Sequence, residues 1–439
     1  MKKKLVAILL PILLAGCAVR THRSNALVST EIQQRTGHPI RPPEERVHGD
    51  VPRGVNLADG ITEDEAVALA LWNNAALSAD LSALGLAQAD LLDAGLLRNP
   101  NIQLLLPTTT KPFELFGQFA VEQFWQRPRR ISAAQKQWDQ VAQALLQNGL
   151  NTVRDARQAH AALLQAQVRS RIAAESADLR QQIAKITQAR LRAGDVSVLD
   201  ARASETDAAN AIELLHRLEH DVEIARQRLR FVAGLSPGPT LRAMASSLNQ
   251  SAPPSEDALR EQAWSSRPDL RALEIGIAAA AERGRWERSR LLTLGALLSS
   301  KRFLNNGVLT GPGLSFDIPI FRSNAGGVAR ADAQVEQATR LYLAQRQRVD
   351  LEVSESRATL IQALDSLRDW RERVLPPAAA AVEGSKSALE AGDASNLFVL
   401  ETTRQHVDAQ LREVDQEAAV RRSWAELERS VGTKIGANQ

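Results

Sequence analysis

Apolar and polar positions alternate with a period of three to four residues over most of this 439-residue chain, in runs far longer than an average globular helix. The runs cover about residues 62–97, 130–193, 197–231, 256–290, 325–391 and 395–431. The longest have about 65 residues, or roughly 95 Å at 1.5 Å per residue. The pattern therefore predicts helical rods and not a globule.

A seven-residue phrase occurs twice, each time between two of these runs. Leu191-Arg192-Ala193-Gly194-Asp195-Val196-Ser197 returns 198 residues later as Leu389-Glu390-Ala391-Gly392-Asp393-Ala394-Ser395. Glycine after a helix is the usual left-handed stop, and a serine three residues later can cap the next helix. Ser197 and Asp200 also approximate a capping box. The phrase predicts two helical-hairpin tips, at 193–197 and 391–395, and an internal duplication.

Two stretches, 101–127 and 291–321, interrupt the helical pattern and predict β-hairpins. Seven of the nine phenylalanines lie in them or at their edges. Residues 314–320 alternate between apolar and non-apolar positions, apart from Pro319, which indicates a strand with one apolar face and one wet face. Each stretch has room for two strands near the ~9–11 residues that span a membrane. The predicted turns are Pro107 to Pro112 and Asn305 to Pro312.

Four strands are too few to stand alone in a membrane. Open sheet edges are not tolerated there, and the smallest bacterial single-chain barrels have about eight strands. Several chains would therefore share one barrel. The alternative is a pair of soluble hairpins that cap the helices.

The N-terminus predicts secretion. Lys2 to Lys4 precede the apolar run Leu5 to Leu14, and small residues follow, as in a signal peptide over residues 1–16. The run is too short to span a membrane, which takes ~20 residues. Cys17 stands where a bacterial lipobox has its acylated residue, and this resemblance implies cleavage before Cys17 and lipid attachment to it. Ala18 in place of aspartate favours the outer membrane. The alternative is a plain signal peptide with an incidental cysteine.

Charge and composition exclude some functions. Removal of three lysines with the signal lowers the formal net charge from +3 to zero, so no basic surplus favours nucleic acid as a partner. Cys17 is the only cysteine, so disulfides contribute nothing. Residues 17–60 are rich in Pro and Arg without apolar periodicity, which predicts an extended, lipid-anchored tether. Residues 235–256 predict a linker, and 432–439 a C-terminal tail.

The order of these features resembles the TolC-type outer-membrane efflux channels. The resemblance covers about residue 60 to the end. It is carried by the lipobox, the doubled layout of helix, β-hairpin and helical hairpin, the repeated tip, and the phrases Ile318-Pro319-Ile320-Phe321, Asn324-Ala325-Gly326-Gly327, Arg267-Pro268-Asp269-Leu270 and Val374-Leu375-Pro376-Pro377. The stretch from Phe321 to Gly327 is similar to the lipidated branch that serves resistance-nodulation-division pumps.

The resemblance implies a mainly α fold with a small β part. Repeats 61–234 and 257–431 would form long helical hairpins in a periplasmic α-barrel, with four strands per chain in a shared, trimeric transmembrane β-barrel. The protein would be a passive outer-membrane channel. It would conduct substrate from a periplasmic adaptor and an inner-membrane pump to the exterior, with no enzymatic activity, cofactor or metal. Drugs and metal ions both remain possible substrates, and the cognate pump and the resting gate state stay open.

The resemblance also implies site residues at the tips. Gly194, Asp195, Ser197, Gly392, Asp393 and Ser395 match the adaptor-docking turns of the family, although helix capping explains the Gly and Ser positions equally well. Glu401 falls near the acidic constriction of the family, with Phe398 beside it. We therefore expect a partly apolar gate.

Two rival functions remain from the sequence. One is a lipid-anchored periplasmic adaptor or coiled-coil scaffold, which would normally carry one helical hairpin. The other is a zinc metallopeptidase, because His216, Glu219 and His220 fit the H-x-x-E-H pattern with both histidines on one helix face. A solvated helix face explains that pattern more simply, since no pocket that excludes water is evident.

Overall fold

The computed structural model describes residues 25–41, 51–52, 54–108, 111–238, 241–290, 293–303, 307–318, 323–391 and 393–435. The chain divides into two compact units. The first, called here the sheet unit, contains Asp80–Leu145 and Pro268–Gln347. The second, the hairpin unit, contains Ser29–Ala79, Leu146–Arg267 and Arg348–Gln439.

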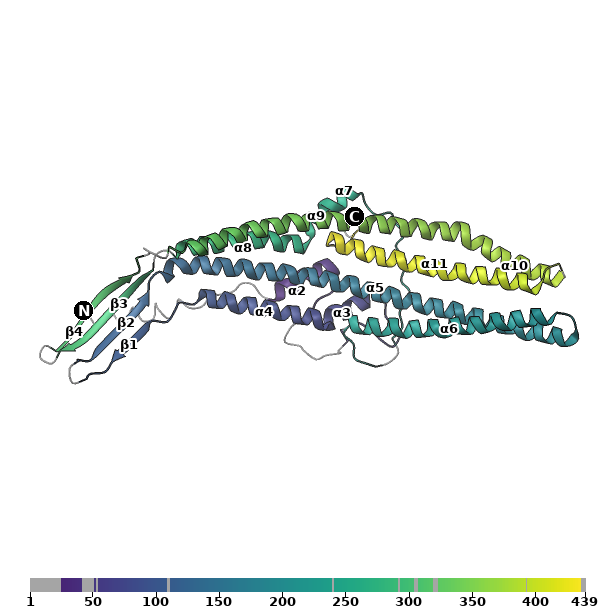
Figure 1. Cartoon of the computed structure of the whole chain (residues 1–439), viewed down its shortest axis with the longest axis horizontal. Helices are drawn as coiled ribbons and strands as arrows, with labels where there is room; N and C mark the ends of the chain where they lie inside the picture. Colours follow the sequence, from purple (N-terminus) through teal and green to yellow (C-terminus); the bar gives the residue numbers. More distant parts are fainter. Residues whose placement is uncertain are drawn as a thin grey trace. The chain divides into compact units, whose positions relative to one another are not determined.

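The sheet unit is built around four antiparallel strands in the order β1-β2-β3-β4 (Figure 1). The strands are β1 (Asn101–Leu105), β2 (Glu114–Ala120), β3 (Leu294–Phe303) and β4 (Gly307–Phe316). The register places Leu104 opposite Leu115, Leu115 opposite Ser300, and Ser300 opposite Thr310. The prediction of two β-hairpins, one in each repeat, is confirmed.

Two details of the second β-hairpin were predicted wrongly. Strand β4 ends at Phe316, so only the first part of the alternating stretch 314–320 is a strand; Asp317 and Ile318 follow it, and residues 319–320 lie outside the described residues. Pro312 lies in β4 opposite Leu298 and not in the turn. Proline has no N–H to donate, and β4 is an edge strand of this sheet, where a missing donor is tolerated.

Helices α4 (Ala75–Gly95) and α8 (Pro268–Ser289) lead into the sheet, and α5 (Gln123–Ala193) and α9 (Ala325–Asp369) lead out of it. Helix α5 has 71 residues and begins at Gln123, earlier than the Arg130 predicted from Pro128. Pro128 removes one backbone hydrogen bond near the helix end. The other backbone hydrogen bonds of α5 do not depend on that one, because each joins a separate pair of residues four apart.

The hairpin unit contains two helical hairpins, and each turns at a predicted tip. In the first, α5 returns as α6 (Val198–Val232). In the second, α9 continues through a π-helical turn (η1, Trp370–Val374) into α10 (Leu375–Ala391) and returns as α11 (Asn396–Val431). Figure 1 shows both tips at the same end of this unit. The mainly helical, internally duplicated fold is therefore confirmed.

The helices that open each repeat are interrupted, although the sequence predicted continuous runs. Helix α3 (Glu63–Asn73) begins with the predicted Thr62–Glu65 capping box and ends before α4 at Asn74. Helix α7 (Glu256–Ser266) ends before α8 at Arg267. Asn74 and Arg267 are both extended, with ψ of 121°. The residue before Pro268 is driven out of the helical region by the proline ring, and the Asn74 carboxamide accepts the Leu77 N–H to start α4.

The prediction of an extended tether over residues 17–60 is wrong for residues 25–36, which form a helix. Helix α2 (Asn25–Thr36) buries Val28 and Ile32, which are one turn apart. Arg35 donates to the carbonyls of Ser266 (2.6 Å) and Gly432 (3.3 Å), at the ends of α7 and α11. A cation at helix C-termini is favourable, so these distant partners stabilise a helix that its own sequence barely signals. The signal peptide and Cys17 lie outside the described residues.

Candidate functional site

The four strands give the sheet two chemically different faces. Side chains alternate along a strand, and residues opposite each other in neighbouring strands share a face. The register therefore fixes both sets. One face, called here the apolar face, carries Ile102, Leu104, Leu115, Phe119, Leu294, Ala296, Leu298, Val308, Pro312, Leu314 and Phe316, interrupted by Gly117, Ser300, Arg302 and Thr310. Most of its large side chains are exposed; Ile102 and Leu314 are each 69% exposed.

The other face, called here the polar face, is hydrophilic. It carries Asn101, Gln103, Glu114, Gln118, Ser299, Lys301 and Ser315 together with four glycines, and its apolar positions are Leu105, Phe116, Ala120, Leu297, Phe303 and Leu309. Lys301 lies opposite Glu114 and forms an ion pair with it at 2.5 Å. A sheet with one exposed apolar face and one polar face fits a boundary between an apolar medium and water.

The edge strands and the residues next to the sheet are also consistent with a membrane environment. Within the described residues, β1 and β4 each pair on one side only. Phe124 and Trp125, in the first turn of α5, are both exposed, as aromatic side chains are at membrane interfaces. Among the helices that the structure describes, none combines the length and the apolar character of a membrane span.

The first hairpin tip is a helix stop followed by a helix start. Gly194 has φ +84°, and the Asp195 N–H donates to the Arg190 carbonyl at 2.9 Å, five residues back. Ser197 and Asp200 form the capping box that the sequence indicated: the Asp200 N–H donates to Ser197 Oγ at 3.1 Å, and Ser197 Oγ donates to Asp200 at 2.7 Å. Gly194 and Ser197 therefore build the turn, whereas the Asp195 side chain is exposed.

The second tip repeats the stop with a weaker start. The Asp393 N–H donates to the Ala388 carbonyl at 2.8 Å, again five residues back, and Ser395 Oγ accepts the Phe398 N–H at 3.3 Å. Phe398 occupies the position of Asp200, so no carboxylate completes the capping box. Gly392 lies outside the described residues.

Both tips expose a leucine that the sequence reasoning missed. Leu199 is 78% exposed and Leu397 is 59% exposed, each two residues after the capping serine. Isolated exposed leucines are common, but the same apolar residue at the same position of two turns marks a repeated surface feature. The repeat itself was the signal that could have found them.

The two predicted gate residues lie in the first turns of α11. Phe398 is 53% exposed. Glu401 accepts hydrogen bonds from Arg404 at 2.9 and 3.1 Å and from Gln405 at 2.9 Å, and these bonds hold the pKa of the Glu401 carboxyl below its usual value. The carboxylate is thus charged, but the guanidinium of Arg404, which the sequence reasoning overlooked, lies directly against it.

The H-x-x-E-H pattern does not assemble into a metal site here. His216, Glu219 and His220 lie on α6, where all three are exposed. Within the described part of the chain, no group of three or more His, Cys, Asp and Glu side chains is placed to hold a metal ion.

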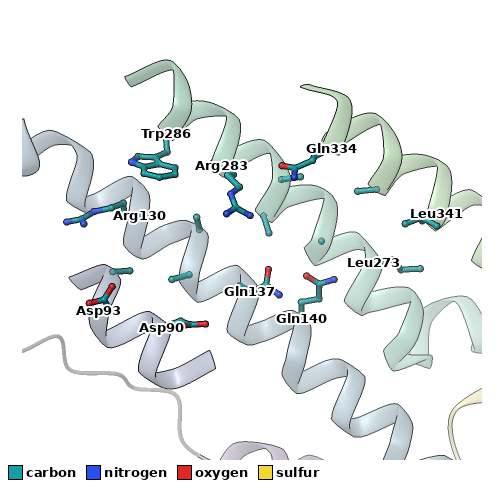
Figure 2. Close-up of a pocket in the computed structure, with 17 residues that line it drawn as sticks. Asp90, Asp93, Arg130, Gln137, Gln140, Leu273, Arg283, Trp286, Gln334 and Leu341 are labelled. Carbon is teal, nitrogen blue, oxygen red and sulfur yellow. The ribbon is translucent and has the colours of Figure 1, made fainter. Parts of the chain in front are cut away.

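A cavity of about 510 Å³ lies among the helices of the sheet unit (Figure 2). Its lining mixes small apolar residues with charged and amide side chains, among them Asp93, Arg130, Gln137 and Arg283. Arg130 also donates to the carbonyl of Leu96 at 3.0 Å, beyond the end of α4. The lining contains no histidine, cysteine or serine, and Asp90 and Asp93 are its carboxylates.

Comparison with known proteins finds a matching family model and a related protein. Residues 259–433 match the outer membrane efflux protein family. The cobalt-zinc-cadmium resistance protein CzcC of Cupriavidus metallidurans is 26% identical over 375 residues, which cover 81% of this chain and 86% of that protein.

Two solved structures have the same fold. The CusC structure, described with its transmembrane channel formation, matches with a TM-score of 0.72 at 18% identity, over 90% of this chain and 98% of that one. The outer membrane protein VceC of Vibrio cholerae matches with a TM-score of 0.71 at 15% identity, over 85% of this chain and 96% of that one. At these identities the likeness shows the fold alone.

Proposed function

We propose that this chain, which matches the outer membrane efflux protein family over residues 259–433, forms the outer-membrane channel of a tripartite efflux system. In this function it conducts substrate passively from a periplasmic adaptor and an inner-membrane pump to the exterior. The family is one of channels and not of enzymes. The observation that carries the proposal is the four-stranded sheet with an exposed apolar face and a polar face, joined to two long helical hairpins.

The sheet supports a trimeric assembly. Its two open edges are unsatisfied in a bilayer, and the smallest bacterial single-chain barrels have about eight strands. Three copies of four strands supply twelve, with the apolar faces toward lipid and the polar faces toward a water-filled lumen. The Lys301–Glu114 ion pair then lies inside the lumen, where water solvates both charges.

We further propose that Cys17 carries the lipid anchor in the outer membrane, on the strength of its lipobox. Helix α2, which follows in sequence, is attached to the hairpin unit through Arg35. The anchor and the channel would then be joined by a short segment.

The tips are proposed to dock the adaptor. Asp195 and Asp393 supply exposed charge, and Leu199 and Leu397 supply exposed apolar surface. Gly194, Gly392, Ser197 and Ser395 would act indirectly, by fixing the turns.

The docking proposal is tested with leucine variants of the tips. Leu199→Ser with Leu397→Ser should weaken binding of the cognate adaptor about tenfold, the loss of roughly 1.4 kcal/mol of apolar contact. Ile186→Ser, at an exposed apolar residue of α5 outside the tip, is the matched control and should change binding less than about twofold. Equal losses in both variants would remove the tips as the docking surface.

Phe398 and Glu401 are proposed to line the constriction at the tip end. The Arg404 guanidinium offsets the charge of Glu401, so Phe398 and not a ring of carboxylates would form most of the barrier. The substrate stays open between drugs and metal ions. Divalent cations are the first to test, because the relative from Cupriavidus metallidurans is a cobalt-zinc-cadmium resistance protein.

The function is tested by recording single-channel currents from the purified, lipidated protein in planar bilayers, with its mass measured in detergent. A trimeric mass with discrete conductance steps is expected. A monomer without conductance would return the sheet to the role of two soluble hairpins on an adaptor or scaffold.

A further inference from the structure

The second hairpin contains a local change of helix geometry that the first lacks. At Trp370–Val374 the helix widens to a π-turn, in which the Leu375 N–H donates to the Trp370 carbonyl, five residues back. Pro376 and Pro377 follow immediately. A proline inside a helix has no N–H, and its ring presses on the carbonyl four residues back, so a wider turn relieves both problems.

The matching part of the first hairpin is a plain α-helix. At the 198-residue offset of the two tips, Asp178 and Leu179 stand where the second hairpin has Pro376 and Pro377. Helix α5 runs without interruption from Gln123 to Ala193. The duplication has therefore kept a straight helix in one copy and a bulged one in the other.

The π-turn is held against the returning helix α11. The Trp370 indole N–H donates to the Ala409 carbonyl at 2.8 Å. Arg371 forms ion pairs with Glu413 at 2.7 Å and Glu417 at 3.3 Å. These contacts fix the turn to one level of α11, between Ala409 and Glu417.

At that level the hydrogen bonds and ion pairs between the two hairpins give way to apolar contact. Farther from the tips, polar pairs join the hairpins: Arg154 with Glu426, Arg157 with Glu428, and Arg169 with Asp415. At the level of the π-turn the contact is an apolar cluster of Ala173, Leu218, Val407 and Leu411. From there to the tips, the described residues form no hydrogen bond or ion pair from one hairpin to the other.

We propose that the π-turn is the bending point of the second hairpin, about which α10 and the first turns of α11 swing when the channel opens. The inference rests on the proposed function, since it assigns a motion to the proposed gate residues Phe398 and Glu401. On one side of the bend polar pairs join this hairpin to the first, whereas on the tip side the described residues form no hydrogen bond or ion pair with it. Bending at the π-turn disrupts few regular α-helical hydrogen bonds, because the turn already has the wider π-helical pattern. Trp370 and Arg371 act as positioning residues that keep the bend at this level.

Hydrogen exchange compares the two helices directly in the wild-type trimer. Backbone amides of residues 370–375 should exchange about tenfold faster than those of residues 172–177 in α5, because local opening is easier at the bulge. The double variant Pro376→Ala with Pro377→Ala restores both donors and should slow exchange at 370–375 about tenfold. Asp178→Ala, at the exposed matching residue of α5, is the control and should leave both segments unchanged.

Single-channel recording then connects the bend to opening. The double proline variant should open about tenfold less often than wild type while its trimeric mass and unit conductance stay the same. Trp370→Phe, which loses the bond to Ala409 but keeps an aromatic ring, should open more often. Equal exchange in the two helices, or unchanged opening in the proline variant, overturns the bending point alone. A wild-type protein that forms no channel overturns the proposed function together with it.

Discussion

The two helical hairpins arose by duplication, yet they differ in how strongly local interactions fix them. The first has an uninterrupted helix of 71 residues and a complete capping box at its tip. The second has a π-turn, two prolines and a tip cap without a carboxylate. The first hairpin therefore has the more regular helix and the more complete cap, and the proposed gate residues lie on the other. Two copies of one layout thus differ in helix geometry at matching positions, and the proposed bending point lies in the copy with the π-turn.

At the ends away from the tips, the two repeats have the same joint made by different residues. In the first repeat Asn74 donates to the Val232 carbonyl at 3.0 Å, near the end of α6. In the second, Arg267 donates to the Ser430 carbonyl at 3.0 Å, near the end of α11. Both returning helices then stop at a left-handed glycine, Gly234 or Gly432. The position of this joint was preserved, and its chemistry was not.

The glycine joints give the largest expected difference between the repeats. A Cβ on Gly234 would overlap the backbone carbonyl of Asn73, whereas a Cβ on Gly432 would lie 3.1 Å from Arg267 Cα. Adding left-handed strain to these clashes, Gly234→Ala should lower stability by about 3 kcal/mol or more and Gly432→Ala by about 1–2 kcal/mol.

Thermal unfolding in detergent, followed by circular dichroism, measures both variants. Gly37→Ala is the control, since Gly37 is also left-handed (φ +85°) but has open space around its Cβ position. It isolates the backbone strain from the clash. If Gly234→Ala melted no earlier than Gly37→Ala, the close approach of α6 to Asn73 would be wrong.

The second largest difference is expected between the two helix breaks, at Asn74 and Arg267. Arg267 is almost fully buried and pairs with Glu352 at 2.6 Å, so Arg267→Met strands a carboxylate that keeps only part of its partners. We expect a loss of about 2–3 kcal/mol. Asn74→Ala loses a neutral cap and should cost about 1 kcal/mol.

The same unfolding experiment compares these two variants. Arg285→Ala, which removes an exposed ion pair with Glu282, serves as a charge-matched control and should change stability by less than about 0.5 kcal/mol. An Arg267→Met protein as stable as Asn74→Ala would mean that the buried pair adds nothing over the neutral joint.

A buried histidine makes the first hairpin sensitive to acid. His160 of α5 is fully buried, its Nε2 lies 2.9 Å from the Ile61 carbonyl, and its Nδ1 has no partner. Burial lowers the pKa of His160 below its usual 6.5. The unfolded chain therefore binds the proton first, and stability falls as pH drops below about 6.5, by up to about 1.4 kcal/mol per pH unit, until the folded-state pKa is passed.

The pH dependence is measured as the difference in melting temperature between wild type and His160→Gln, from neutral pH downward. The subtraction is needed because Glu63 also responds to acid. Burial raises the pKa of Glu63, so the folded protein binds this proton more readily than the unfolded chain does. Near pH 4.5 the protonation of Glu63 therefore stabilises the protein, an effect opposite in sign to that of His160. Parallel curves for the two proteins at pH 5–6.5 would contradict the assignment to His160.

The smallest effect concerns the proposed gate of the second hairpin. Arg404→Ala removes the partner of an exposed carboxylate, so melting should not change, but the negative charge of Glu401 is no longer offset. The cation-over-anion permeability ratio should rise about two- to threefold in single-channel recordings. Adding Glu401→Gln should return the ratio to that of wild type; a ratio unaffected by Arg404→Ala would place Glu401 away from the conducting path.

Much of the fold was predictable because its signals are local. The tips depend on a glycine and a serine three residues apart, and the capping boxes at Thr62 and Ser197 depend on a carboxylate three residues after the cap. Helical periodicity and the alternating strand pattern also arise between near neighbours in the chain. In the candidate site, these short-range signals were sufficient to predict both tips. It did not yield Leu199 and Leu397, whose exposure depends on what covers the turn.

What the sequence by itself determined is the set of elements: two repeats, four strands, two hairpins and their capped tips. Tertiary structure alone decided how these elements bend and join. Helix α2 forms because Arg35 reaches carbonyls 231 and 397 residues away, and β4 accepts Pro312 because it lies at a sheet edge. The prolines after the π-turn were visible, but the bulge they produce is fixed where Trp370 meets Ala409. Hydrogen bonds between neighbours are encoded in short phrases, whereas bonds between distant segments form only once packing has brought them together.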